Sequence, residues 1–201
     1  MNAEEHVKRG SECFKQDDYD QAITHFREAL RLDPNIKAAK NGLVNSYYNR
    51  GTTYFEKGDN NRAIADLSEA IKLDPDDIDF YRARGYMYKT IGNRDGVIKD
   101  FGKAIEIDKD DASNYFPRAE IYRELGKEAR ESGNDKDGSK FLEYTNKAIK
   151  DFDYGLNEAK KGLTGENAEQ LTELYKKQLE LLTKELGSRT KVYDALNNDS
   201  N

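Results

Sequence analysis

The histidines and the cysteine are the side chains of this sequence best suited to metal binding or nucleophilic chemistry. The chain has two histidines, His6 and His25, and one cysteine, Cys13. Neither histidine stands at a metal-ligand spacing from the cysteine or from carboxylates. The sequence also lacks a phosphate-binding glycine loop, a nucleophile elbow and a His-Glu zinc motif. We therefore expect no enzyme activity, no cofactor and no metal ion, and we interpret Cys13 as a small apolar packing residue.

Arginines and aspartates recur at fixed places along the chain. Four arginines each stand directly before a small residue, and they are Arg9, Arg50, Arg84 and Arg118. Three aspartates recur further on, and they are Asp66, Asp100 and Asp151. If the intervening chain forms an antiparallel helical hairpin, the aspartates lie roughly level with the arginines. Because a guanidinium binds a carboxylate through two parallel hydrogen bonds, we predict a ladder of structural Arg-carboxylate pairs.

A sequence repeat underlies this spacing. The segments AIKLDPDD at Ala70 and AIEIDKDD at Ala104 lie 34 residues apart, and ALRLDPNI at Ala29 lies 41 residues before the first of them. Within each unit, apolar and small residues fall three or four apart in two blocks, which predicts two amphipathic helices. Turn-forming residues such as Gly58-Asp59 separate the blocks. The predicted helical hairpins cover residues 3–36, 44–77 and 78–111, and a fourth begins at residue 112.

The order of large, small and aromatic residues in each unit carries a family resemblance. In the second unit the pattern is formed by Tyr47, Gly51, Tyr54, Ala63, Leu67 and Pro75. It resembles the tetratricopeptide-repeat family. The resemblance implies an all-α, right-handed superhelical solenoid of helical hairpins, in which the first helices line a concave groove that binds another protein or a peptide. His6 and His25 occupy positions that the family fills with aromatic residues, so we interpret both as packing residues.

The predicted array, residues 3–161, departs from regular repeats in two places, and a separate helix follows it. Residues 37–43 are an insertion that keeps a helix within about 20° of its phase. It predicts a two-turn extension of the next helix, with a kink at Gly42 as the competing interpretation. In the enlarged fourth unit, 112–161, both helices are expected to lengthen around a turn at 132–139. Residues 162–201 contain a leucine stripe, which predicts a helix that either caps the array or associates with a second copy.

The composition restricts the partners. Lys and Arg total 33 against 39 Asp and Glu, which gives a net charge of −6, and the pI is about 5.2. An acidic chain of this kind disfavours nucleic acid as a partner. The sequence has no apolar run long enough to cross a membrane, and its first ten residues lack the apolar stretch of a secretory signal. A cytoplasmic location is therefore expected.

The family resemblance also predicts binding residues. The positions that would face the groove are Tyr48, Asn49, Thr52, Phe55, Arg82, Tyr86, Lys89, Phe116, Glu120 and Arg123. Three of them are basic in an acidic protein, which predicts an anionic or carboxylate-bearing segment as the ligand.

The chaperone-binding members of the family provide a stricter test. The positions at which they hold a terminal carboxylate read Val7, Ser11, Asn49, Asp79 and Ala83 here. Only Asn49 matches, so we exclude that this chain holds a chaperone's terminal carboxylate in the way those members do. We expect a non-catalytic peptide- or protein-binding adaptor, with self-assembly through the C-terminal helix or the groove as the alternative.

Overall fold

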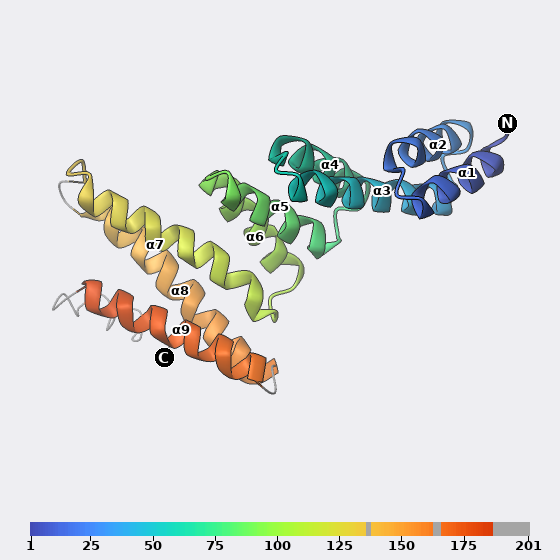
Figure 1. Cartoon of the computed structure of the whole chain (residues 1–201). Helices are drawn as coiled ribbons and strands as arrows, with labels where there is room; N and C mark the ends of the chain where they lie inside the picture. Colours follow the sequence, from blue (N-terminus) through green and yellow to red (C-terminus); the bar gives the residue numbers. More distant parts are fainter. Residues whose placement is uncertain (136–137, 163–165, 187–201) are drawn as a thin grey trace. The chain divides into compact units, whose positions relative to one another are not determined.

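The computed structural model describes residues 1–135, 138–162 and 166–186, and over these ranges the chain is helical with no β-strand. It divides into two compact units, residues 1–107 and 108–201, called unit 1 and unit 2 below. Unit 1 contains α1 (Ala3–Lys15), α2 (Tyr19–Leu32), α3 (Lys37–Glu56), α4 (Asn60–Leu73), α5 (Ile78–Thr90) and α6 (Arg94–Ile107). Unit 2 contains the short 3₁₀ helix η1 (Ala112–Asn114), α7 (Tyr115–Glu131), α8 (Ser139–Gly162) and α9 (Glu166–Leu186). Figure 1 shows both units.

Unit 1 is a series of three antiparallel helix pairs, α1/α2, α3/α4 and α5/α6, as predicted. The turns between paired helices need one residue in the left-handed backbone conformation. Gly58 and Gly92 adopt it, with φ of 79° and 72°. Asp17 adopts the same conformation, with φ of 58°, in the first pair. After two of these turns an aspartate caps the second helix, because the side chains of Asp18 and Asp59 accept hydrogen bonds from backbone N–H groups three residues later.

The insertion at 37–43 extends α3, which runs without interruption through Gly42. This confirms the predicted helix extension. A glycine is required there because a Cβ atom at Gly42 would lie 2.3 Å from Cζ of the Phe26 ring. Phe26 is 2% exposed, and burying a phenylalanine side chain contributes about 1.5–3 kcal/mol to folding. Cys13 is half-buried and packs against the same core cluster, as expected.

Unit 2 is built from longer helices. Those of the fourth hairpin, α7 and α8, have 17 and 24 residues. Helix α9 packs against α8. Its main anchor is Tyr175, which is fully buried and whose hydroxyl group donates a hydrogen bond to the carbonyl oxygen of Ala112. Gly155 of α8 gives the Tyr175 ring the space it needs, since a Cβ atom there would overlap the ring.

Candidate functional site

The recurring arginines form the predicted ladder in repeats two, three and four. Arg84 donates two hydrogen bonds to Asp100, from Nε at 2.8 Å and from Nη2 at 2.7 Å. Arg50 binds Asp66 in the same way at 2.8 and 2.7 Å. The pair in unit 2 joins Arg118 to Asp151, with both distances 2.8 Å. The three aspartates are nearly fully buried, so these pairs join the two helices of each hairpin.

The arginines of repeats two and three also lie between tyrosines of their own helix. The guanidinium carbon of Arg84 is 6.0 Å from the ring centre of Tyr81 and 5.8 Å from that of Tyr88. Burial lowers the pKa of Arg84, but the hydrogen bonds and charge of Asp100 raise it by more, so its pKa is above the ordinary value. The guanidinium is therefore charged at any physiological pH. Its hydrogen bonds to a buried partner give it a structural role.

The predicted binding residues of α3 are half-buried and mostly engaged with their own unit. Tyr48 lies against Phe80 of α5, with ring centres 5.4 Å apart. Asn49 donates from Nδ2 to the carbonyl oxygen of Asn45 at 2.8 Å, and Thr52 donates to the carbonyl oxygen of Asn49 at 2.8 Å. Phe55 packs at the edge of a small core cluster that contains Met87 of α5. Tyr48 and Phe55 therefore lie next to α5, whereas Asn49 and Thr52 bond within α3.

The predicted binding residues of α5 include the most exposed of the ten side chains. Tyr86 is 50% exposed, although one edge of its ring rests on Phe101 at a centre distance of 5.1 Å. Arg82 stands one turn before Tyr86 and has 24% of its side chain exposed, with Nη1 3.4 Å from Asp79. Lys89 stands one turn after Tyr86 and is exposed. Positions three and four residues apart share one face of a helix, so α5 presents an aromatic ring between two cations.

The remaining predicted residues lie on α7, in unit 2. Phe116 is half-buried and packs against Phe152 at 5.5 Å and Tyr175 at 5.6 Å, so its ring belongs to the contact between α7, α8 and α9. Glu120 and Arg123 are half-buried on the same helix. The Nε atom of Arg123 is buried and lacks a hydrogen-bond partner among the described residues.

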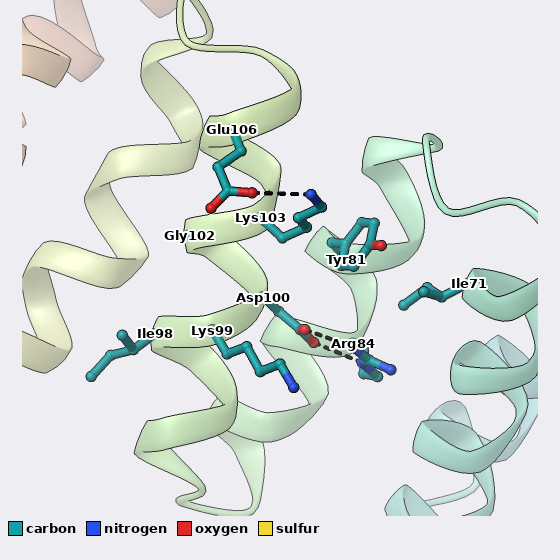
Figure 2. A pocket seen from close by; sticks show the side chains of 9 residues that line it. All are labelled: Ile71, Tyr81, Arg84, Ile98, Lys99, Asp100, Gly102, Lys103 and Glu106. Atoms are coloured by element: carbon teal, nitrogen blue, oxygen red, sulfur yellow. Dashed lines mark hydrogen bonds and ion pairs between the residues drawn. The ribbon is translucent and has the colours of Figure 1, made fainter.

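A cavity of about 570 Å³ lies elsewhere in unit 1, against α4, α5 and α6. Figure 2 shows that the Arg84–Asp100 pair forms part of its wall and that Lys103 reaches Glu106 beside it. Lys99 also lines it. None of the predicted binding residues does so. Sequence reasoning missed this cavity because its lining comes from three helices, and its lysines have the spacing of an ordinary solvated face.

Comparisons with known proteins define the class. Family models described as TPR repeat or tetratricopeptide repeat match residues 3–36, 51–92 and 78–111. The chain belongs to the tetratricopeptide-repeat family, so the predicted family and the all-α repeat fold are confirmed. Repeats of this family generally act as non-catalytic scaffolds for protein interaction. A comparison with curated proteins found no match.

The solved structures that resemble this chain are distant from it in sequence. A tetratricopeptide-repeat protein from Parabacteroides merdae is 16% identical with a TM-score of 0.57, and the match covers 98% of this chain and 66% of that one. A protein from Bacteroides ovatus is 14% identical with a TM-score of 0.50, covering 92% of this chain and all of that one. The MamA protein is 19% identical with a TM-score of 0.43, covering 94% of both chains. At these identities the likeness concerns the fold alone.

Within the described ranges, no helix combines the length and the apolar character needed to span a membrane. Over the same ranges, histidine, cysteine and acidic side chains nowhere gather in groups of three or more that could hold a metal ion.

Proposed function

We propose that this chain is a non-catalytic adaptor that holds a segment of another protein on the surface formed by α3 and α5 of unit 1. This surface, the α3–α5 face, consists of Tyr48, Asn49, Thr52, Phe55, Arg82, Tyr86 and Lys89. The observation that supports it best is Tyr86, a half-exposed aromatic ring set between Arg82 and Lys89 on one face of α5. Tyrosine and arginine are enriched among the residues that dominate binding energy at protein interfaces.

The charge of this face favours an acidic ligand segment. The protein carries a net charge of −6, yet Arg82 and Lys89 place two cations beside the aromatic ring. A carboxylate of the ligand can bind a guanidinium through two hydrogen bonds, while an apolar side chain covers the Tyr86 ring. Asp79, which is largely exposed beside Arg82, would exchange its weak contact at 3.4 Å for solvent.

A selection from a displayed peptide library enriched in acidic residues tests this function. Selected peptides should bind the Tyr86→Ala and Arg82→Gln variants about tenfold or more weakly than the parent protein, the loss typical of an interface anchor. The matched control is Leu32→Ala, because Leu32 is 43% exposed and lies on α2. Melting temperatures of all variants show whether folding is preserved. Peptides that bind Tyr86→Ala as tightly as the parent protein would exclude the α3–α5 face.

A second candidate function, self-assembly, has support of its own on α9. Leu174 and Leu181 stand seven residues apart on this helix and are 39% and 38% exposed. Residues with this spacing share one face of a helix, and paired helices often bury such leucines. Light scattering of the parent protein and of a Leu174→Glu, Leu181→Glu double variant tests this. A parent protein that stays monomeric at high concentration would eliminate self-assembly, whereas a dimer that only the double variant breaks would support it.

A further inference from the structure

The first repeat lacks the arginine–aspartate pair that joins the helices of the later repeats. Arg9 has the position of Arg84, but the residue sixteen positions later is His25, where the later repeat has Asp100. The expectation that His25 stands at an aromatic position was therefore wrong, because it aligns with the aspartates of the later repeats. The residue three positions before Arg9 is His6, where the later repeat has a tyrosine. The only two histidines of the chain therefore replace two members of the same cluster. They lie on opposite helices of the hairpin, α1 and α2.

The two imidazole rings meet in the structure. Their Nδ1 atoms are 3.1 Å apart and share a hydrogen bond, in which one imidazole donates and the other accepts. The ring centres are 5.3 Å apart, with the planes tilted by 46°. Both side chains are half-buried, so ions in solution can reach them. Zinc–imidazole bonds are about 2.05 Å long. With the two nitrogens 3.1 Å apart, a metal ion at that distance from both would have an N–metal–N angle of about 98°. This value lies between the square-planar and the tetrahedral angle.

We propose that His6 and His25 bind one divalent transition-metal ion through their Nδ1 atoms, and that the ion joins α1 to α2. The ion replaces the hydrogen bond between the rings, and the ring that donated it changes to the tautomer that carries its proton on Nε2. It would take the structural place that the arginine–aspartate pair has in the later repeats. Imidazole nitrogens suit Cu²⁺, Ni²⁺ and Zn²⁺. Since the described residues offer no third histidine, cysteine or carboxylate in this cluster, water completes the coordination. The structure thus brings together two residues whose sequence spacing gave no reason to expect a metal site.

The charges around the histidine pair act in opposite directions. Burial lowers the pKa of His25, and the neighbouring His6 and Arg9 lower it further. The positive charge of Arg9 also repels a bound cation. Glu28, on α2 one turn beyond His25, opposes this repulsion: Arg31 and, to a lesser extent, His6 lower the pKa of its carboxyl group, so it stays ionised. Replacing Arg9 with glutamine should therefore strengthen metal binding.

Proton NMR tests the proposal directly, because a chain with two histidines has only two sets of imidazole signals. Zn²⁺ is titrated at neutral pH into untagged protein that comprises residues 1–201. Both sets should shift along one shared binding curve that saturates at one equivalent of Zn²⁺. Hydrogen exchange of α1 should slow in the same titration, since a ligand that binds only the folded hairpin stabilises it. Imidazole signals that stay unchanged in excess Zn²⁺, or a shift of only one set, would overturn the proposal.

Three variants separate this site from adventitious binding. His6→Tyr restores the residue of the later repeats, so it should fold while binding Zn²⁺ about tenfold or more weakly, as expected when one of two protein ligands is lost. Cys13→Ser should bind like the parent protein, which excludes the thiol as a ligand. Arg9→Gln should bind more tightly than the parent protein. Unchanged affinity of His6→Tyr, or weaker binding by Cys13→Ser, contradicts the assignment.

Discussion

The Arg84→Leu substitution tests most sharply whether the ladder is structural. Leucine is the residue that the family pattern has at this position, so the change itself is compatible with the fold. Asp100, however, is 1% exposed, and both hydrogen bonds to its carboxylate come from Arg84. The substitution leaves that carboxylate buried without a donor. Breaking a buried ion pair by removing one partner costs about 3–5 kcal/mol.

Proton uptake sets an upper limit on the part of this cost that comes from the buried charge. An aspartate with an ordinary pKa of about 3.9 can be neutralised at pH 7 for about 4 kcal/mol, since each pH unit is worth about 1.36 kcal/mol. In Arg84→Leu, the buried carboxyl group would bind a proton more tightly in the folded chain than in the unfolded chain. Stability is then gained as the pH falls, so the deficit should shrink by up to about 2.7 kcal/mol between pH 7 and pH 5.

Urea unfolding followed by far-UV circular dichroism measures the loss, and hydrogen exchange of α5 and α6 assigns it to unit 1. The matched control is Arg31→Leu, because Arg31 forms an exposed ion pair with Glu28. Losing that pair should lower the free energy of unfolding by at most about 1 kcal/mol. An Arg84→Leu, Asp100→Leu double variant should regain most of the loss, since no charge is left buried. An Arg84→Leu protein with parental stability and lost ligand binding would refute the structural role.

Four further predictions follow from single contacts. Gly42→Ala should gain about 1 kcal/mol of helix propensity but lose about 1–3 kcal/mol through the clash with Phe26, so urea unfolding should show a net loss. Gly92→Ala should cost about 1–2 kcal/mol through its positive φ alone, because no atom lies near the added Cβ, and Gly92→Asn should cost less by the same assay. Tyr175→Phe should lose about 0.5–1.5 kcal/mol, because the buried hydrogen bond from its hydroxyl group to the carbonyl oxygen of Ala112 is lost, and hydrogen exchange of α9 should quicken. The pKa of His25 is lowered in the folded chain, so its contribution to stability is present above about pH 6.5 and is lost as the pH falls. Between pH 7.5 and pH 5.5, the melting temperature of the parent protein should therefore fall by more than that of His25→Gln.

Local signals predicted most of the fold. The hairpins could be predicted because each has apolar residues at helical spacing, and because residues such as Gly58 favour turns through their own backbone preferences. The pairing of Arg84 with Asp100 was readable for a similar reason, since a fixed hairpin converts a sixteen-residue separation into a side-by-side position. At Gly42 the local signal was ambiguous. Helix propensity allowed a kink, and the ring of Phe26 explains why glycine is needed in an unbroken helix.

The candidate site was less predictable, because side-chain exposure depends on what packs from elsewhere in the chain. Tyr86 and Phe116 were predicted as equivalent binding residues. Tyr86 is half-exposed, whereas Phe116 packs against Tyr175, which lies 59 residues further along the chain. Repeat spacing contains no information about that contact, since α9 lies outside the repeat pattern.

The sequence by itself determined the repeat class, the helix pairs and the arginine–aspartate ladder, because these depend on contacts within one repeat. Only the tertiary structure decided which side chains are buried by later helices, where three helices leave a cavity, and how closely the ring nitrogens of His6 and His25 approach each other. The histidines illustrate the physical reason. Each stands at an ordinary packing position of its own helix, and a shared site arises only when two antiparallel helices bring their ring nitrogens within 3.1 Å.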